Sequence, residues 1–226
     1  MYMSRIRLQP EAANRSSFWS AMQDGYQVHR QLWSLFADSD DRKRDFLYRQ
    51  EERRGAPVFF AVSDREPKDT KGIWHIDSKP YQPKLSVGQR LAFVVRVNPV
   101  RSKRDDAGKQ HRHDVVMDAK VRVKESKPGT NENPSEADIV QREGNAWLAA
   151  RAAEYGFAVG EADVRIDGYR QHQWIKRRTG HAIRFSTVEI TGLLTVIDAE
   201  LFSQTLRHGI GAAKGFGCGL LLVKPA

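Results

Sequence analysis

The sequence predicts an α+β protein with two tandem units, each in the order strand, helix, strand, strand, helix, strand, the first unit being less regular. The length of 226 residues suits two domains of about 100 residues each. Strand and helix patterns follow this order from residue 90 onward, and the part before it begins in the same way. The order is that of ferredoxin-like and RNA-recognition folds. We therefore expect one domain over residues 1–88 and a second over residues 89–226.

In the first unit, apolar and polar side chains alternate in MYMSRIRL (1–8), which predicts a strand. A helix is expected over YQVHRQLWSLF (26–36), where the apolar residues have helical spacing and Asp24 with Gln27 resembles a capping box.

Further along the first unit, APVFFAV (56–62) is typical of a buried strand. The charged stretch 38–55 before it is expected to be exposed, apart from a docked patch at residues 46–48. Pro80 and Pro83 interrupt the next strand pattern, which indicates an edge strand followed by a linker.

The second unit has clearer boundaries. Its helices are expected to end at glycines, and Asp198 is expected to cap the second one. The polar segment 124–140 is interpreted as a local insertion without an assigned function. The predicted elements are strand 90–100, a helix over 139–156, two strands within 164–196, a helix over 199–208 and a closing strand over 217–225.

The formal net charge of +9 favours a polyanionic partner, and nucleic acid is preferred over a merely solvated basic surface. No apolar run approaches the roughly 20 residues that span a bilayer, so no membrane partner is expected. The N-terminus lacks the apolar core of a signal peptide, and the single Cys218 excludes an internal disulfide and a cysteine-based zinc site. A cytoplasmic protein without metal or cofactor is expected.

Five glycines and one lysine lie between residues 209 and 219, in GIGAAKGFGCG. The stretch matches neither the P-loop pattern nor the dinucleotide-binding fingerprint. One interpretation is a loop whose backbone and Lys214 approach a phosphate backbone closely. The other is a helix cap followed by a glycine-rich turn without a ligand.

Two basic arms are candidates for contact with nucleic acid. YRQHQWIKRRTGHAIR (169–184) contains five Lys or Arg and no acid, and a hairpin of this kind can enter a groove of an RNA stem. RSKRDDAGKQHRHD (101–114) has turn residues between two basic segments, but its aspartates weaken the case. For each arm, the alternative is a solvated basic surface.

The glycine pattern resembles the C-terminal signature of the repeat-associated RNA-binding proteins of CRISPR systems. MYMSRIRL, YQVHRQLWSLF and FVVRVNPV add further matches, spread over nearly the whole chain. Together they are similar to the CasE family, whose members process CRISPR precursor RNA.

The resemblance implies two ferredoxin-like halves that bind the stem-loop of the CRISPR repeat. It implies an endoribonuclease that cuts at the base of the stem without metal, leaving 5′-hydroxyl and 2′,3′-cyclic phosphate ends. The mature crRNA would stay bound, and the protein would join the other subunits of Cascade.

The family motif marks His29, which is expected to be the general acid because histidine titrates near neutral pH. Tyr26, one turn earlier, is expected to orient the 2′-hydroxyl or help to deprotonate it, and Lys176 to contact the scissile phosphate. The alternative for His29 is a half-buried side chain packed beside Trp33. The residues expected to bind RNA are Arg30, Arg101, Lys103, Arg104, Lys109, Arg170, Arg177, Arg178, Lys214, Gly209, Gly211, Gly217 and Gly219.

Two other functions remain open at this point. One is a catalytically silent RNA-binding subunit on the same fold. The other is a general RNA-binding protein with tandem RNA-recognition folds, although the aromatic motif usual in that class has no convincing copy here. The sequence also leaves open the repeat recognised, the cleaved nucleotide and whether the free protein forms a weak dimer.

Overall fold

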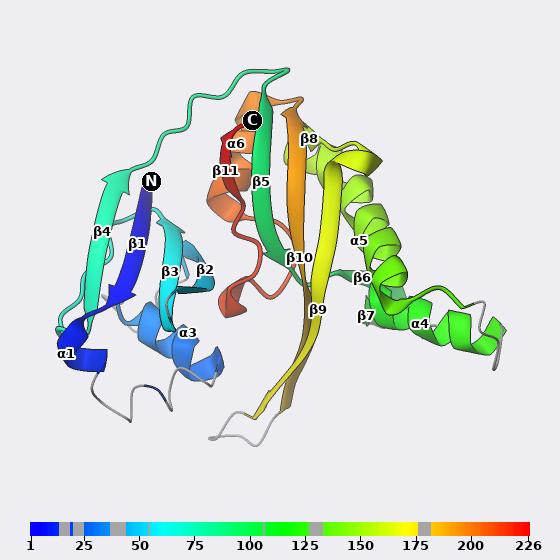
Figure 1. Ribbon diagram of the computed structural model, residues 1–226, viewed down its shortest axis with the longest axis horizontal. Helices are drawn as coiled ribbons and strands as arrows, with labels where there is room; N and C mark the ends of the chain where they lie inside the picture. The colour runs from blue at the N-terminus through cyan, green and yellow to red at the C-terminus, as the bar shows by residue number, and fades with distance from the viewer. Residues whose placement is uncertain are drawn as a thin grey trace.

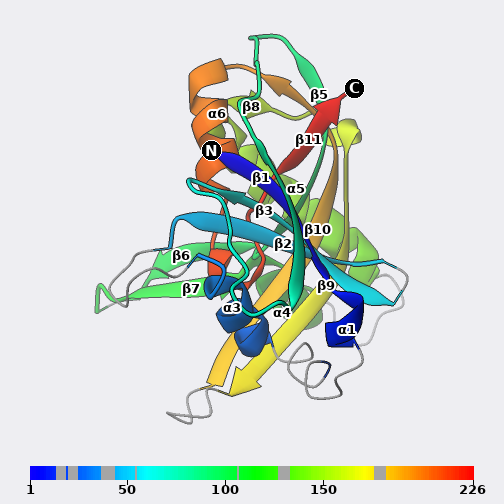
Figure 2. The same ribbon diagram turned by 90° about the vertical axis from the view of Figure 1, so that its left-hand side faces the viewer.

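The computed structural model has two antiparallel β-sheets side by side, with the C-terminal segment running between them (Figure 1). A two-stranded ribbon projects from the body to one side (Figure 2). None of the helices in the described part of the chain has the length and apolar character that crossing a lipid bilayer requires. The structure describes residues 1–13, 19, 25–36, 44–53, 55–105, 107–126, 133–175 and 182–226.

The first sheet is formed by the N-terminal part of the chain. Its elements are β1 (Tyr2–Leu8), α1 (Pro10–Ala13), α3 (Gly25–Trp33), β2 (Phe46–Arg53), β3 (Ala56–Ser63) and β4 (Trp74–Pro80). The strand order is β2-β3-β1-β4, and each neighbouring pair is antiparallel. α3 covers one face of this sheet, because Val28 and Leu32 pack with Ile6 and Phe59 in one core.

The expected N-terminal strand, the helix after it and the strand 56–62 are confirmed, and β4 is the expected edge strand. Asp24 of the expected capping box lies outside the described residues. The docked patch at residues 46–48 is confirmed, because these residues are buried in β2, and Glu52 and Arg53 are exposed as expected. The prediction of an exposed side chain is wrong for Arg49. Arg49 is buried there because its Nη1 lies 2.9 Å from Oε2 of Glu189 in the second sheet. A distant partner of this kind has no local sequence signal.

The second sheet follows the linker after β4. Its elements are β5 (Arg90–Val97), α5 (Glu136–Ala152), β8 (Phe157–Ala158), β9 (Val164–Ile175), β10 (Ala182–Val196), α6 (Ala199–His208) and β11 (Leu222–Pro225). The strand order is β11-β5-β10-β8, and β9 also pairs with β10. Trp147 and Leu148 of α5 share one core with Phe202 and Leu206 of α6, so both helices cover this sheet.

The C-terminal ends of these helices and the cap of α6 follow the sequence prediction, whereas α5 begins at Glu136, earlier than the expected residue 139. Ser135 and Asp138 form a capping box at the start of α5, and the chain leaves this helix through a short 3₁₀ turn to Gly156. Asp198 accepts a hydrogen bond from the backbone N–H of Leu201, 2.9 Å away, at the start of α6. Gly209 ends α6 as expected.

Besides the short β8, the second unit has three elements beyond the predicted order: β6 (Val100–Arg104), β7 (Gln110–Asp114) and α4 (Val115–Ser126). β6 and β7 pair as a hairpin, so the arm 101–114 has the turn its sequence suggested. The sequence did not predict α4, which has only a short buried face. Segment 124–140 is mainly the end of α4 and the start of α5, with residues 127–132 outside the described part. The closing strand begins at Leu222, later than predicted, because residues 217–219 form a turn.

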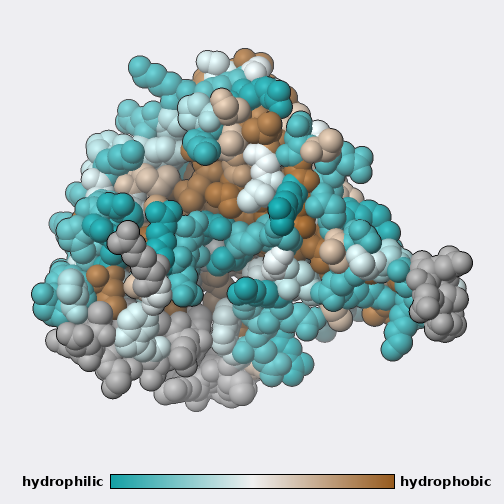
Figure 3. All heavy atoms as spheres, viewed as in Figure 1, coloured by the Kyte–Doolittle hydropathy of each residue, from teal (hydrophilic) through white to brown (hydrophobic). Residues whose placement is uncertain are grey.

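The two sheets contact each other through apolar and charged side chains. Leu47 and Val62 of the first sheet form a buried cluster with Leu220 of the C-terminal segment. Partly buried apolar side chains surround this cluster, and apolar atoms are visible between the sheets on this face (Figure 3). Arg96 also donates to the backbone carbonyl of Gln50 across the interface, at 3.3 Å. Residues from both sheets can therefore form one site.

Candidate active site

α3 presents His29 toward the C-terminal segment. Val28 and Leu32 are buried in the core, and His29 is half-buried at its edge. The centroid of the His29 ring lies 5.8 Å from that of Trp33 and 6.1 Å from that of Phe216. The packing beside Trp33 that the alternative interpretation predicted is present, and a second aromatic ring, from the C-terminal segment, also contacts the histidine.

A 3₁₀ turn over Lys214–Phe216 brings the glycine-rich segment to His29. The hydroxyl of Tyr48 donates a 3.1 Å hydrogen bond to the carbonyl oxygen of Gly215. A Cβ at Gly215 would lie 2.9 Å from Nη1 of Arg44 and 3.7 Å from Cε1 of His29. Because residue 215 has no side chain, both basic groups can lie directly against the loop.

His29, Arg44 and Lys214 form a basic cluster around Gly215. Burial first, and then the charge of Arg44, lower the pKa of His29 below its ordinary value of 6.5, while the backbone of Gly215 acts in the opposite direction. The His29 Nδ1 is buried beside that backbone, but it has no partner of good hydrogen-bond geometry among the described residues.

The pKa of Lys214 is lowered by the same two causes, burial first and then Arg44. Within the described residues, no carboxylate compensates the charge of Arg44 or Lys214. Like charges held together without an acid favour the binding of an anion.

Phe216 connects this cluster to the long strands of the second sheet. Its ring centroid lies 5.4 Å from that of Trp174 on β9 and 5.3 Å from that of Phe185 on β10. The arm formed by β9 and β10 extends toward the end of the molecule where α3 lies (Figures 1 and 2). Its tip, with the candidates Lys176, Arg177 and Arg178, lies outside the described residues.

The other candidates on α3 and β9 have less direct relations to the cluster. Tyr26 is half-buried on α3, three residues before His29, and it has interaction partners in the folded chain. Arg30 is exposed on α3 and Arg170 is exposed on β9. Of the candidates, the structure thus brings His29 and Lys214 to one place.

The candidates on the β6–β7 hairpin are partly neutralised. Nη2 of Arg101 and Nζ of Lys103 lie 3.0 Å and 3.1 Å from Oδ2 of Asp118 on α4. Arg104 and Lys109 are exposed on the same hairpin. Because one carboxylate serves two of these cations, the hairpin is a weaker anion site than the cluster around Gly215.

The glycines of the C-terminal segment pack against protein atoms. Gly209 and Gly219 have φ of +71° and +87°, and a Cβ on Gly209 would lie 2.6 Å from the Gly219 carbonyl oxygen. Gly211 lies against Trp147, and Gly217 against Tyr48. Close approach within the protein therefore accounts for these glycines. Their expected contact with RNA stays a prediction.

Sequence reasoning did not single out Arg44, Tyr48 and Phe216 for this site. Arg44 lies just before the apolar residues that begin β2, inside a stretch interpreted as exposed. Phe216 is the one aromatic residue within the glycine-rich stretch. An aromatic side chain between glycines is the signal that could have identified it.

The chain is 30% identical to the CRISPR system Cascade subunit CasE of Escherichia coli (strain K12), over 228 residues that cover 100% of both proteins. It belongs to the CasE family of CRISPR-associated proteins. Residues 1–225 also match the family model described as CRISPR associated protein. The family match therefore covers nearly the whole chain.

A second relative is the CRISPR-associated endoribonuclease Cse3 of Thermus thermophilus, which is 28% identical over 242 residues, with 100% of both proteins covered. Among solved structures, that of CRISPR endoribonuclease Cse3 bound to a 19-nucleotide RNA is 27% identical, with a TM-score of 0.71 and full coverage of both chains. The mixed α/β fold with antiparallel sheets is thus the fold of this endoribonuclease.

Proposed function

We propose that this protein is a metal-independent endoribonuclease that binds the stem-loop of the CRISPR repeat and cuts precursor crRNA at the base of the stem. The observation that carries the proposal is the cluster of His29, Arg44 and Lys214, held where the two sheets meet. It combines a group suited to proton transfer with positive charge that no described acid neutralises. Full-length similarity to an endoribonuclease, and to its RNA-bound structure, supports the same reaction.

The proposed fold is a tandem of two ferredoxin-like domains, residues 1–88 and 89–226. The strand orders β2-β3-β1-β4 and β9-β10-β5-β11 support it, because each is the 4-1-3-2 order of a split βαβ unit read from the other edge. The first domain lacks the second helix of that unit, since residues 64–73 connect β3 to β4 without one.

In the proposed reaction, the 2′-oxygen attacks the neighbouring phosphorus and forms the 2′,3′-cyclic phosphate. The bond from phosphorus to the 5′-oxygen breaks, and His29 donates the proton that makes this oxygen a hydroxyl. Tyr26 orients the 2′-hydroxyl or assists its deprotonation, and the proton that leaves this hydroxyl passes to solvent water. Lys176, together with Arg44 and Lys214, stabilises the negative charge that develops on the phosphoryl oxygens.

Binding of RNA prepares His29 for this role. Burial and Arg44 keep its pKa low in the free protein, so the neutral imidazole prevails at neutral pH. A bound phosphodiester adds a negative charge next to the ring, which favours the protonated form. The acid is therefore formed together with the complex.

The product is proposed to remain bound as mature crRNA, with the protein acting as a subunit of a cytoplasmic Cascade complex. The similarity to the Cascade subunit CasE over the full length of both chains supports these partners. RNA contacts are assigned to the β9–β10 arm and to the glycine-rich segment.

Cleavage of end-labelled repeat RNA by the purified protein tests the proposal. We expect one cut at the base of the stem, unaffected by excess EDTA, and no cut when the nucleotide at that position carries a 2′-deoxyribose. A requirement for divalent metal, or cleavage of the deoxy substrate, would contradict the mechanism. Tight binding without any cleavage would instead identify a catalytically silent RNA-binding subunit.

A further inference from the structure

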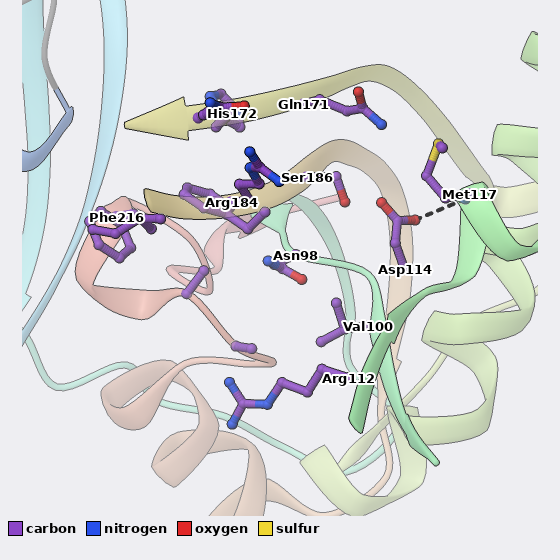
Figure 4. Close-up of a pocket in the computed structure, with 15 residues that line it drawn as sticks. Asn98, Val100, Arg112, Asp114, Met117, Gln171, His172, Arg184, Ser186 and Phe216 are labelled. Atoms are coloured by element: carbon purple, nitrogen blue, oxygen red, sulfur yellow. Dashed lines mark hydrogen bonds between the residues drawn. The ribbon is translucent and has the colours of Figure 1, made fainter. Parts of the chain in front are cut away.

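A cavity of about 700 Å³ lies in the second sheet's half of the molecule, beside the candidate active site. Gln171 and Arg184 of the β9–β10 arm line one side, Arg112 of β7 lines another, and Phe216 closes the end (Figure 4). Phe216 also contacts His29, so a single aromatic ring separates the cavity from the proposed acid. The volume is in the range of sites that bind small organic groups.

Asn98 carries the decisive polar group of this cavity. It follows β5, it is only 4% exposed, and its side chain points into the cavity in Figure 4. Its backbone is held by an isolated bridge to Ala212 and by a 2.9 Å hydrogen bond from the N–H of Val100 to its carbonyl oxygen. Among the described residues, none donates a hydrogen bond to Oδ1 of this amide. A buried amide oxygen normally has a donor, so a ligand is expected to supply one.

The rest of the lining favours a flat, neutral ligand over a phosphate. Phe185 stacks on His172 at 5.0 Å with 23° between the ring planes, and Phe216 lies at 30° to Phe185. Asp114 is already occupied, since its carboxylate accepts bonds from the hydroxyl of Tyr169 and from two backbone N–H groups. Its charge also offsets part of that of the two arginines in the lining.

We propose that this cavity binds one unpaired nucleobase of the RNA, from a nucleotide close to the cleaved bond. The inference rests on the proposed function. Sequence-specific RNA recognition commonly places an unstacked base against aromatic or guanidinium planes and reads its edge with polar groups. The Asn98 amide offers an acceptor and a donor side by side, as base edges do. The cavity is formed by the arm and the loop that the same RNA is proposed to contact.

An abasic scan tests this site. Repeat RNA with a 2′-deoxy nucleotide at the cut position keeps the RNA intact, and each unpaired nucleotide flanking the stem is made abasic in turn. We expect one position to lose about 5–150-fold in affinity, the range for one stacked base. Asn98→Ala is expected to weaken binding of the intact RNA. In this variant, removing the base at that position should cost no further affinity.

Asn145→Ala is the matched control, because Asn145 is a buried amide of α5 that bonds to the carbonyl of Glu161 and does not line the cavity. In the Asn145→Ala variant, removing the base at the scanned position should cost as much affinity as in the unmodified protein. If circular dichroism shows that Asn98→Ala misfolds, Gln171→Ala on the exposed wall of the cavity replaces it. In that variant, removing the base at the same position is expected to cost less affinity than in the unmodified protein.

An equal loss of affinity at every scanned position would overturn the assignment. It would also be overturned if one abasic position loses the same affinity in the unmodified protein and in both cavity variants, Asn98→Ala and Gln171→Ala. Binding of free nucleoside monophosphates that depends on Asn98, without any sensitive position in the RNA, would assign the cavity to a free nucleotide and also overturn it. Failure to cleave repeat RNA at all would refute the proposed function. Normal cleavage, together with no loss of affinity at any scanned position, would refute only the base-binding cavity.

Discussion

Strands β2-β3-β1-β4 of the first sheet and β9-β10-β5-β11 of the second follow the same order, and the second sheet has the additional short β8. The two sheets differ in what covers them and in what they contribute. Among the described residues, α4, α5 and α6 contribute side chains to the core of the second sheet, whereas α3 is the helix that does so in the first. The first sheet supplies His29 and Arg44, and the second supplies Lys214, Phe216 and the long arm. The cluster therefore exists only when the sheets are joined.

The glycine-rich segment is the piece that joins them. It belongs to the second sheet by sequence, yet its residues contact Leu47, Tyr48 and His29 of the first. Buried pairing of Arg49 with Glu189 reinforces the same junction. In the proposed mechanism, the half of the molecule with the first sheet supplies the acid. The half with the second sheet binds RNA and supplies Lys176 and Lys214 for charge stabilisation.

Replacing His29 should give the largest effect. We expect His29→Ala to slow single-turnover cleavage by about 10²–10⁴-fold, the usual contribution of a positioned acid or base, with nearly unchanged RNA affinity. His75→Ala, at an exposed histidine of β4, is the control and should cleave normally. Normal cleavage by the His29 variant would show that the general acid is another group.

The joining segment can be tested at two of its glycines. A Cβ at Gly219 would lie 2.6 Å from the backbone oxygen of Ile210, at a φ of +87°, so Gly219→Ala should destabilise the fold by about 2–4 kcal/mol. Gly215→Ala meets mainly the flexible end of Arg44, so it should keep its thermal unfolding temperature and lose cleavage. Equal unfolding temperatures for both variants would mean that the segment does not hold the sheets together.

The basic arms should differ in their share of RNA binding. Alanine at Lys176, Arg177 and Arg178 should weaken binding and flatten the log–log salt dependence by about one unit for each phosphate contact removed. Alanine at Arg101 and Lys103 should change that slope less, because Asp118 already pairs with both. A larger change in the slope on replacing Arg101 and Lys103 would mean that the β6–β7 hairpin, and not the β9–β10 arm, makes most of the phosphate contacts.

The pH dependence of cleavage should give the smallest effect and would define the role of His29. Its pKa in the free protein lies below 6.5, and an acid acts in its protonated form. At subsaturating protein the rate should therefore fall as pH rises through that pKa, by up to about tenfold per pH unit, and His29→Ala should lose this limb. A rate that instead rises with pH through His29 would make it the base.

Local chemistry alone determined much of the second unit. The alternating pattern of β5, the cap at Asp198 and the stop at Gly209 each depend on a few neighbouring residues, so the sequence predicted them correctly. His29 was marked as the candidate acid by the resemblance of YQVHRQLWSLF to the CasE family, and local chemistry alone did not distinguish it from a packed histidine. β2 and α4 were missed, because Arg49 is buried by a partner in the other sheet and α4 has only a narrow buried face.

The tertiary structure alone decided how the candidate site is assembled. His29, Arg44 and Gly215 are far apart in sequence, and no periodicity records that the glycine-rich segment packs on α3 and β2. The same packing explains the glycines themselves, whose close neighbours are protein atoms that the sequence could not identify. Side-chain patterns report local conformation and burial, whereas the meeting of distant groups depends on how the two sheets pack together.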